Sequence, residues 1–129
     1  MTQPRLVVAA AICAEAKVLA AARSYPPELA GLWEFPGGKV EEDETDAEAL
    51  RRECDEELGV AIAVGERVGD DVVADGGRFL LRVYRAELLG GEPEAREHAG
   101  LRWLTADELD DVPWLPGNRP VLEALRETL

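Results

Sequence analysis

Cysteine is scarce in this sequence, and its scarcity argues against an architecture built on cysteine chemistry. Cys13 and Cys54 are the only cysteines among 129 residues, and they form no CxxC pair and no cysteine–histidine cluster. The spacing typical of a cysteine-based metal site is therefore missing. Two distant cysteines in a chain without a secretion signal favour buried apolar thiols over a disulfide.

Long apolar runs are also missing. The longest, from Leu6 to Ala14, is the length of a strand and falls far short of the roughly 20 residues that span a bilayer. It lacks the basic start and the cleavage pattern of a signal peptide. We therefore expect a cytoplasmic protein with no membrane partner.

Basic residues are few. The 14 lysines and arginines face 27 acidic residues, which gives a formal net charge of −13. This balance argues against binding to a nucleic-acid polymer, which requires a basic face. A small phosphorylated substrate remains compatible with it if metal ions neutralise the local acid. Alternatively, most of the charge serves solubility.

The remaining composition is globular, with 47% hydrophobic and 32% charged residues, and the length predicts a single domain over residues 1–129. The patterns predict strands and helices that interleave in an α+β or α/β/α arrangement. Expected strands cover residues 5–13, 17–23, 60–73, 78–88 and 101–104, with a short extended piece at 33–35. Turns are expected at 36–38 and 74–77, a short helix after Thr105, and a terminal helix over 119–129.

The central helix has the clearest local signals. A capping box at residues 45–48 predicts that it begins at Asp46, and Gly59 supplies its C-terminal stop. Apolar residues at helical spacing form its expected core face: Ala47, Leu50, Cys54 and Leu58.

Three carboxylates follow another stripe of this helix. Glu53, Glu56 and Glu57 have i, i+3 and i+4 spacing, so they lie on neighbouring turns. Each like-charged pair costs a few tenths of a kcal/mol even when exposed. A hard divalent cation such as Mg²⁺ or Mn²⁺ would turn this repulsion into binding. The alternative is a solvated, salt-bridged helix face.

These acids belong to a longer string: Gly38, five residues, Glu44, seven residues, and then Arg52 to Val60. This string resembles the Nudix box, the signature of hydrolases that act on nucleoside diphosphates linked to another group. Only Cys54 departs from the pattern, because the family usually has an aliphatic residue there. The likeness extends to residues 33–39, to the strand around Trp103 and to residues 115–120, and the whole is similar to MutT-type and CTP-type nucleotide pyrophosphohydrolases.

The resemblance implies an α/β/α sandwich with a mixed central sheet flanked by helices. It implies metal-dependent hydrolysis of a nucleoside triphosphate, such as 8-oxo-dGTP or a cytidine nucleotide, to the monophosphate and pyrophosphate. The cofactor would be Mg²⁺, with Mn²⁺ as the alternative, and the partner a small nucleotide bound by a monomer or homodimer.

The resemblance also assigns residues. Arg52, Glu53, Glu56 and Glu57 would be catalytic, with Arg52 orienting a carboxylate and Glu53 the first choice of general base. The metal ligands would be the following: the three glutamates, a backbone carbonyl of Gly37 or Gly38, and Glu97. Glu44 would support the loop and the helix start.

Weaker signals concern the substrate. Arg23 and Lys39 match positions that contact phosphates in related proteins, and Asn118 would either bind a base edge or cap the last helix. The candidates for base stacking, each alternatively a core residue, are Trp33, Phe35, Phe79 and Trp114. His98, the only histidine, is expected in a neutral loop or packing role.

Three other functions stay open. One is the hydrolysis of ADP-ribose or another nucleotide sugar, and another is a non-catalytic nucleotide sensor on the same fold. The third is an acidic protein-interaction module with no Mg²⁺-dependent turnover.

Overall fold

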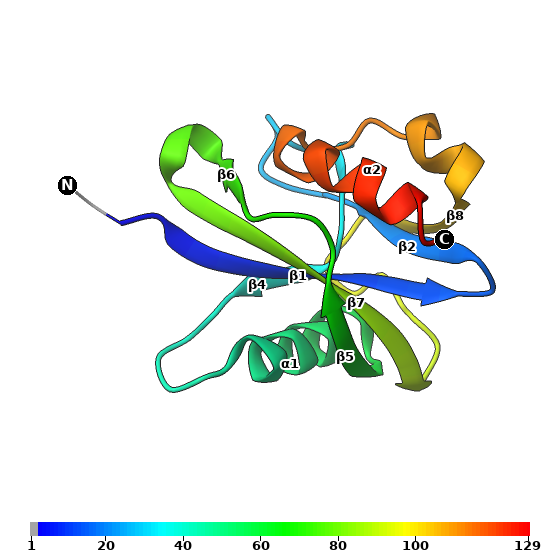
Figure 1. Ribbon diagram of the computed structural model, residues 1–129, viewed down its shortest axis with the longest axis horizontal. Coiled ribbons are helices and arrows are strands. Elements are labelled where there is room, and N and C mark those ends of the chain that lie inside the picture. The colour runs from blue at the N-terminus through cyan, green and yellow to red at the C-terminus, as the bar shows by residue number, and fades with distance from the viewer. Residues whose placement is uncertain (1–2) are drawn as a thin grey trace.

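The computed structural model describes residues 3–129, and its centre is the strand β1 (Arg5–Ala14) (Figure 1). The other strands are β2 (Lys17–Ala22), β3 (Trp33–Glu34), β4 (Gly37–Lys39), β5 (Ala61–Arg67), β6 (Val72–Ala74), β7 (Phe79–Gly90) and β8 (Gly100–Thr105). The α-helices are α1 (Asp46–Leu58) and α2 (Arg119–Arg126), and the 3-10 segments are η1 (Asp75–Gly77), η2 (Ala106–Asp111) and η3 (Pro116–Asn118).

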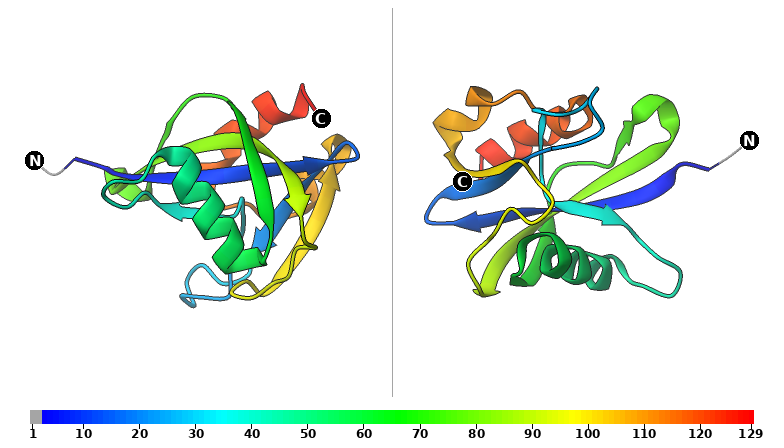
Figure 2. Two further views of the ribbon diagram at one scale, coloured as in Figure 1. Left: turned by 90° about the horizontal axis from the view of Figure 1, so that it is seen from below. Right: turned by 180° about the vertical axis from the view of Figure 1, so that it is seen from behind.

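The sheet is mixed, as predicted. Its main order is β3-β2-β1-β7-β5, with β4 paired to β1, β6 to β7 and β8 to β2. Strand β1 runs parallel to β7 from the pair Arg5 and Phe79 to the pair Ile12 and Ala86, and the other pairings are antiparallel. Helix α1 covers one face and α2 the other, which confirms the predicted α/β/α sandwich (Figures 1 and 2).

Strand β1 supplies both hydrophobic cores because neighbouring side chains point to opposite faces of a sheet. Val8, Ala10 and Ile12 pack with the buried side of α1. Ala9 and Ala11 lie on the other face, in the core that includes α2. A strand covered on both faces reads as a continuous apolar run, which is the pattern of residues 6–14.

Helix α1 begins and ends where its sequence predicts. The Thr45 hydroxyl accepts from the Glu48 backbone N–H, and the Glu48 carboxylate accepts from the Thr45 backbone N–H. Gly59 adopts φ +70° at the C-terminal end. Leu50, Cys54 and Leu58 are fully buried, whereas the predicted core residue Ala47 is half-buried. Burial raises the pKa of the Cys54 thiol to about 12, so this residue packs as an apolar group; both cysteines are free.

Two predictions about strands and turns are wrong. The predicted turn at residues 36–38 is largely the strand β4, which pairs with Val7–Ala9 of β1. The glycines there do mark close approaches: Gly37 to the backbone of β1 and Gly38 to the Glu53 side chain on α1. The predicted strand over 60–73 is divided into β5 and β6 with Gly69 at φ +68° between them, and both parts pair with the long strand β7.

The C-terminal elements follow the prediction with shorter bounds. The segment after Thr105 has its capping box but forms the 3-10 turn η2, and α2 ends at Arg126. Within residues 3–129, every helix is too short or too polar to cross a bilayer.

Candidate active site

Glycine and carboxylate meet where β4 passes α1. A Cβ atom placed on Gly38 would lie 2.4 Å from Cδ of Glu53 and 2.6 Å from both of its carboxylate oxygens. A side chain at position 38 would therefore displace that carboxylate. Of the three predicted helix acids, Glu53 is therefore the one that directly faces the glycine segment.

Arg52 links the loop before α1 to the acids on it. Its Nε and Nη2 donate to the two carboxylate oxygens of Glu44 at 2.7 and 2.9 Å, and its Nη1 donates to Oε1 of Glu53 at 2.7 Å. The Arg52 guanidinium lowers the pKa of Glu44 to about 2. Glu44 thus orients Arg52, and Arg52 orients Glu53.

Glu57 is the buried acid of the stripe, with 6% of its surface exposed. Its Oε1 lies 3.7 Å from Nε2 of His98, while its Oε2 is buried without a hydrogen-bond partner among the described residues. Burial, and then the nearby carboxylates of Glu53, Glu34 and Glu97, raises the pKa of Glu57 far above its usual range. A buried carboxyl oxygen of this kind is costly unless a ligand satisfies it.

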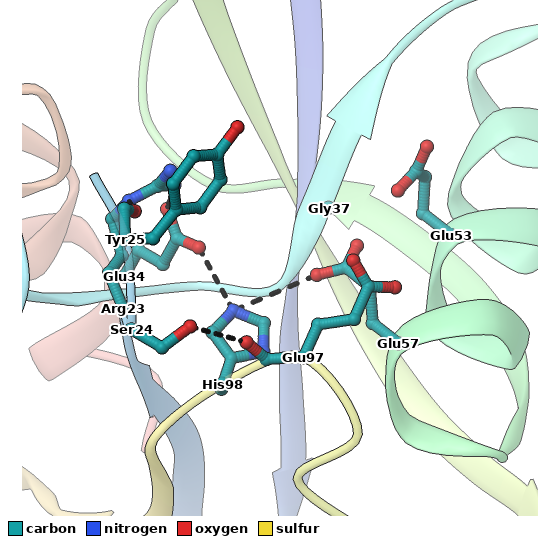
Figure 3. Close-up of a pocket in the computed structure, with 9 residues that line it drawn as sticks. All are labelled: Arg23, Ser24, Tyr25, Glu34, Gly37, Glu53, Glu57, Glu97 and His98. Atoms are coloured by element: carbon teal, nitrogen blue, oxygen red, sulfur yellow. Dashed lines mark hydrogen bonds and ion pairs between the residues drawn. The ribbon is translucent and has the colours of Figure 1, made fainter.

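Glu53 and Glu57 open onto one cavity of about 200 Å³ (Figure 3). Residues from four separate stretches of the chain line it: Arg23, Ser24, Tyr25, Glu34, Gly37, Glu53, Glu57, Glu97 and His98. Four of these side chains are carboxylates and one is a guanidinium. Glu56, by contrast, is 54% exposed and does not line the cavity.

Tyr25, Glu34 and His98 line this cavity although sequence reasoning did not place them there. The Glu34 carboxylate accepts from Arg23 at 3.0 Å on Oε1 and lies 3.0 Å from His98 Nε2 on Oε2. Glu34 precedes the buried Phe35 in a short apolar segment. A single charge in such a segment was the only sequence feature that could have indicated a functional role for Glu34. His98 is buried as a packing residue would be, but its Nε2 also faces the carboxylates of Glu34 and Glu57, which the sequence did not predict.

Two of the predicted substrate residues lie elsewhere. Lys39 and Phe79 line a second hollow of about 880 Å³ that also includes Arg5 and Arg78. The Lys39 Nζ atom lies 5.7 Å from the centroid of the Phe79 ring, and the Arg78 guanidinium carbon lies 5.4 Å from it. Gly37, two residues before Lys39 on β4, lines the acidic cavity, so the strand joins the two hollows.

The structure contradicts the stacking role of Phe35 and the capping role of Asn118. Phe35 is 3% exposed and packs on Trp114 with 4.8 Å between ring centroids, so its ring has no face free for a base. Asn118 is 6% exposed, and its side chain makes no capping bond to α2. Its Oδ1 instead accepts from the Phe35 backbone at 3.1 Å, which ties the segment before β4 to the start of α2.

The carboxylate oxygens that line the acidic cavity are ligands of the kind that a hard cation binds. Over residues 3–129, no three acidic, histidine or cysteine side chains converge tightly enough to hold a metal ion as they lie. Glu53 is held by Arg52 and Glu57 faces His98, as expected for acids that repel one another. Oxygen donors on one cavity and the partnerless oxygen of Glu57 nevertheless fit Mg²⁺, which binds through a few carboxylates together with substrate phosphates.

The mixed sheet between two helices and its acidic cavity define a Nudix hydrolase. Residues 3–125 match the NUDIX domain family, and the chain belongs to that family. A protein of Mycobacterium tuberculosis with the provisional name 8-oxo-dGTP diphosphatase 2 is 53% identical over 97% of this chain and 90% of its own length. The CTP pyrophosphohydrolase of Escherichia coli is 42% identical over 92% of this chain and 88% of its own length.

Solved structures agree with this assignment. The E. coli ORF135 protein superposes with a TM-score of 0.82 and 38% identity over 97% of this chain and 90% of its own. A MutT NUDIX hydrolase from Burkholderia pseudomallei gives the same TM-score with 35% identity over 95% and 98%.

Proposed function

We propose that the protein is a Mg²⁺-dependent pyrophosphohydrolase that converts a nucleoside triphosphate to the monophosphate and pyrophosphate. The observation that supports it most is the cavity in which Glu53 and the buried, partly unpartnered Glu57 face Arg23. The acids need a cation, and the guanidinium offers a contact for phosphate oxygens. The similarity to the 8-oxo-dGTP and CTP enzymes favours an oxidised or surplus nucleotide as substrate.

In this proposal Glu53 and Glu57, together with Glu56, Glu97 and a backbone carbonyl of Gly37 or Gly38, hold the Mg²⁺. When bound, the cation neutralises phosphate charge and makes water more acidic. Arg52 keeps the Glu53 carboxylate directed at the cavity, where it can accept the proton of the attacking water. Arg23 binds phosphate oxygens while its contact with Glu34 limits its movement.

The two hollows divide the substrate between them. The acidic cavity, at about 200 Å³, accommodates metal and phosphates, whereas the hollow at Phe79, at about 880 Å³, has room for the nucleoside. The half-buried ring of Phe79 lies there beside Arg78 and Lys39, whose place on the ring a base would have to take, and Lys39 lies between the two parts on β4. Because both residues line this hollow, Lys39 would contact a phosphate and Phe79 the base.

Replacing Phe79 by Leu is expected to raise KM for the preferred nucleotide about tenfold with a smaller change in kcat. Leucine retains apolar bulk but removes the aromatic face, and base stacking is worth roughly 1–3 kcal/mol. Steady-state kinetics would measure it. Tyr25→Leu is the matched control because Tyr25 is 72% exposed at the acidic cavity; a larger rise in KM there would put the base at Tyr25 instead.

A Mg²⁺-dependent hydrolysis screen tests the function itself. We expect 8-oxo-dGTP or a cytidine nucleotide to have the highest kcat/KM among 8-oxo-dGTP, dCTP, CTP, 5-methyl-dCTP and ADP-ribose, with pyrophosphate as a product. A preference for ADP-ribose would overturn the substrate class, and turnover of none would favour a sensor or an interaction module.

A further inference from the structure

His98 occupies a position that a simple packing role does not explain. Its side chain is 5% exposed, yet its Nε2 faces two carboxylates: Glu34 Oε2 at 3.0 Å and Glu57 Oε1 at 3.7 Å (Figure 3). Arg23 holds the other oxygen of Glu34. Three side chains, from β3, from α1 and from the loop before β8, therefore meet at one nitrogen atom.

We propose that His98 is a positioning residue for Glu57, an inference that rests on the proposed metal site. Both groups that face Nε2 are carboxylates, so this nitrogen carries the hydrogen: it donates to Oε2 of Glu34 and lies 3.7 Å from Oε1 of Glu57. Glu34, anchored by Arg23, fixes the direction of the imidazole. The imidazole in turn restrains Oε1 of Glu57 and leaves the partnerless Oε2 for the cation.

The loop around His98 is held without help from the imidazole. On one side, the Glu97 carbonyl accepts from the Ser24 hydroxyl at 2.8 Å, and on the other, the Ala99 backbone donates to the Ala22 carbonyl at 2.8 Å. The loop is therefore attached to the end of β2 on both sides of His98. Substitution of the side chain should leave the backbone in place, so an effect on Glu57 can be separated from unfolding.

The two ring nitrogens permit a sharp test. Nδ1 of His98 is buried without a hydrogen-bond partner among the described residues, so all polar contact passes through Nε2. The amide nitrogen of glutamine can occupy the place of Nε2, whereas that of asparagine corresponds to Nδ1. We expect His98→Asn to weaken Mn²⁺ binding on the order of tenfold, and His98→Gln to stay close to the wild type.

Mn²⁺ affinity would be measured in the absence of nucleotide from the electron paramagnetic resonance signal of the free ion, alongside thermal melting. Glu94→Gln is the control, because Glu94 is an exposed acid of the same loop outside the cavity. If a His98 variant does not fold, Glu34→Gln removes the charge that orients the imidazole and should weaken Mn²⁺ binding in the same direction.

The outcomes are distinguishable. Equal affinity of the wild type, His98→Asn and His98→Gln would overturn the positioning role while the metal site persists. Equal weakening of Mn²⁺ binding in both variants would show that His98 only fills space and does not position Glu57 through Nε2. If the wild type itself bound no Mn²⁺, the proposed function would fail and this inference with it.

Discussion

Glu57→Gln is expected to lower kcat/KM by about 10²- to 10³-fold in the presence of Mg²⁺. Glutamine keeps the volume of the side chain but cannot supply the negative charge that the cation requires. Burial already raises the pKa of Glu57 and favours its neutral form without metal, so the metal-free variant should melt no earlier than the wild type. Steady-state kinetics and thermal melting with and without Mg²⁺ would measure both effects.

Mg²⁺ itself provides a second readout for this variant. A ligand that binds only the folded state stabilises it, so Mg²⁺ should raise the melting temperature of the wild type and raise that of Glu57→Gln much less. Asp55→Asn is the matched control, since Asp55 is an exposed acid on the same helix outside the cavity. Near-normal hydrolysis by Glu57→Gln, or an undiminished response to Mg²⁺, would show that Glu57 is no metal ligand.

Gly37→Ala is expected to lower stability, whereas Gly38→Ala is expected to lower activity and leave the fold intact. A Cβ on Gly37 would lie 2.0 Å from the carbonyl oxygen of Val8, a backbone atom of β1. The strand pairing must then shift, at a cost of about 1–3 kcal/mol in the free energy of unfolding. The atoms nearest to a Cβ on Gly38 belong to the end of the Glu53 side chain, which can turn away.

Gly38→Ala should therefore stay folded while its kcat/KM falls about 10- to 100-fold, since the Glu53 carboxylate loses its position. Chemical denaturation and steady-state kinetics of the two variants would separate the effects. A Gly38→Ala variant with full activity would argue against Glu53 as a catalytic or metal-binding group. A Gly37→Ala variant as stable as the wild type would contradict the close packing of β4 on β1.

The metal-binding helix was largely predictable because its signals are local. The capping box and Gly59 bound α1 within the helix itself, and the i, i+3 and i+4 spacing of the acids is a property of any helix. The apolar face at Leu50, Cys54 and Leu58 determined which side packs on the sheet. The family could be recognised for the same reason, because its signature lies within one continuous stretch.

The rest of the cavity could not be predicted because it depends on pairing between distant strands. Glu34 and His98 are 64 residues apart, and nothing local in either segment encodes their contact. Likewise, β4 forms because β1 lies beside it as an antiparallel partner. Residues 60–73 have the composition of one strand, but pairing with β7 divides them.

The sequence by itself determined the fold class, the helix and its three acids, because these follow from local spacing and hydrophobic pattern. Only the tertiary structure decided which of those acids is buried, that His98 faces it, and that Lys39 and Phe79 line a separate hollow. The physical reason is that burial and side-chain partnership are set by what the sheet brings together from distant parts of the chain.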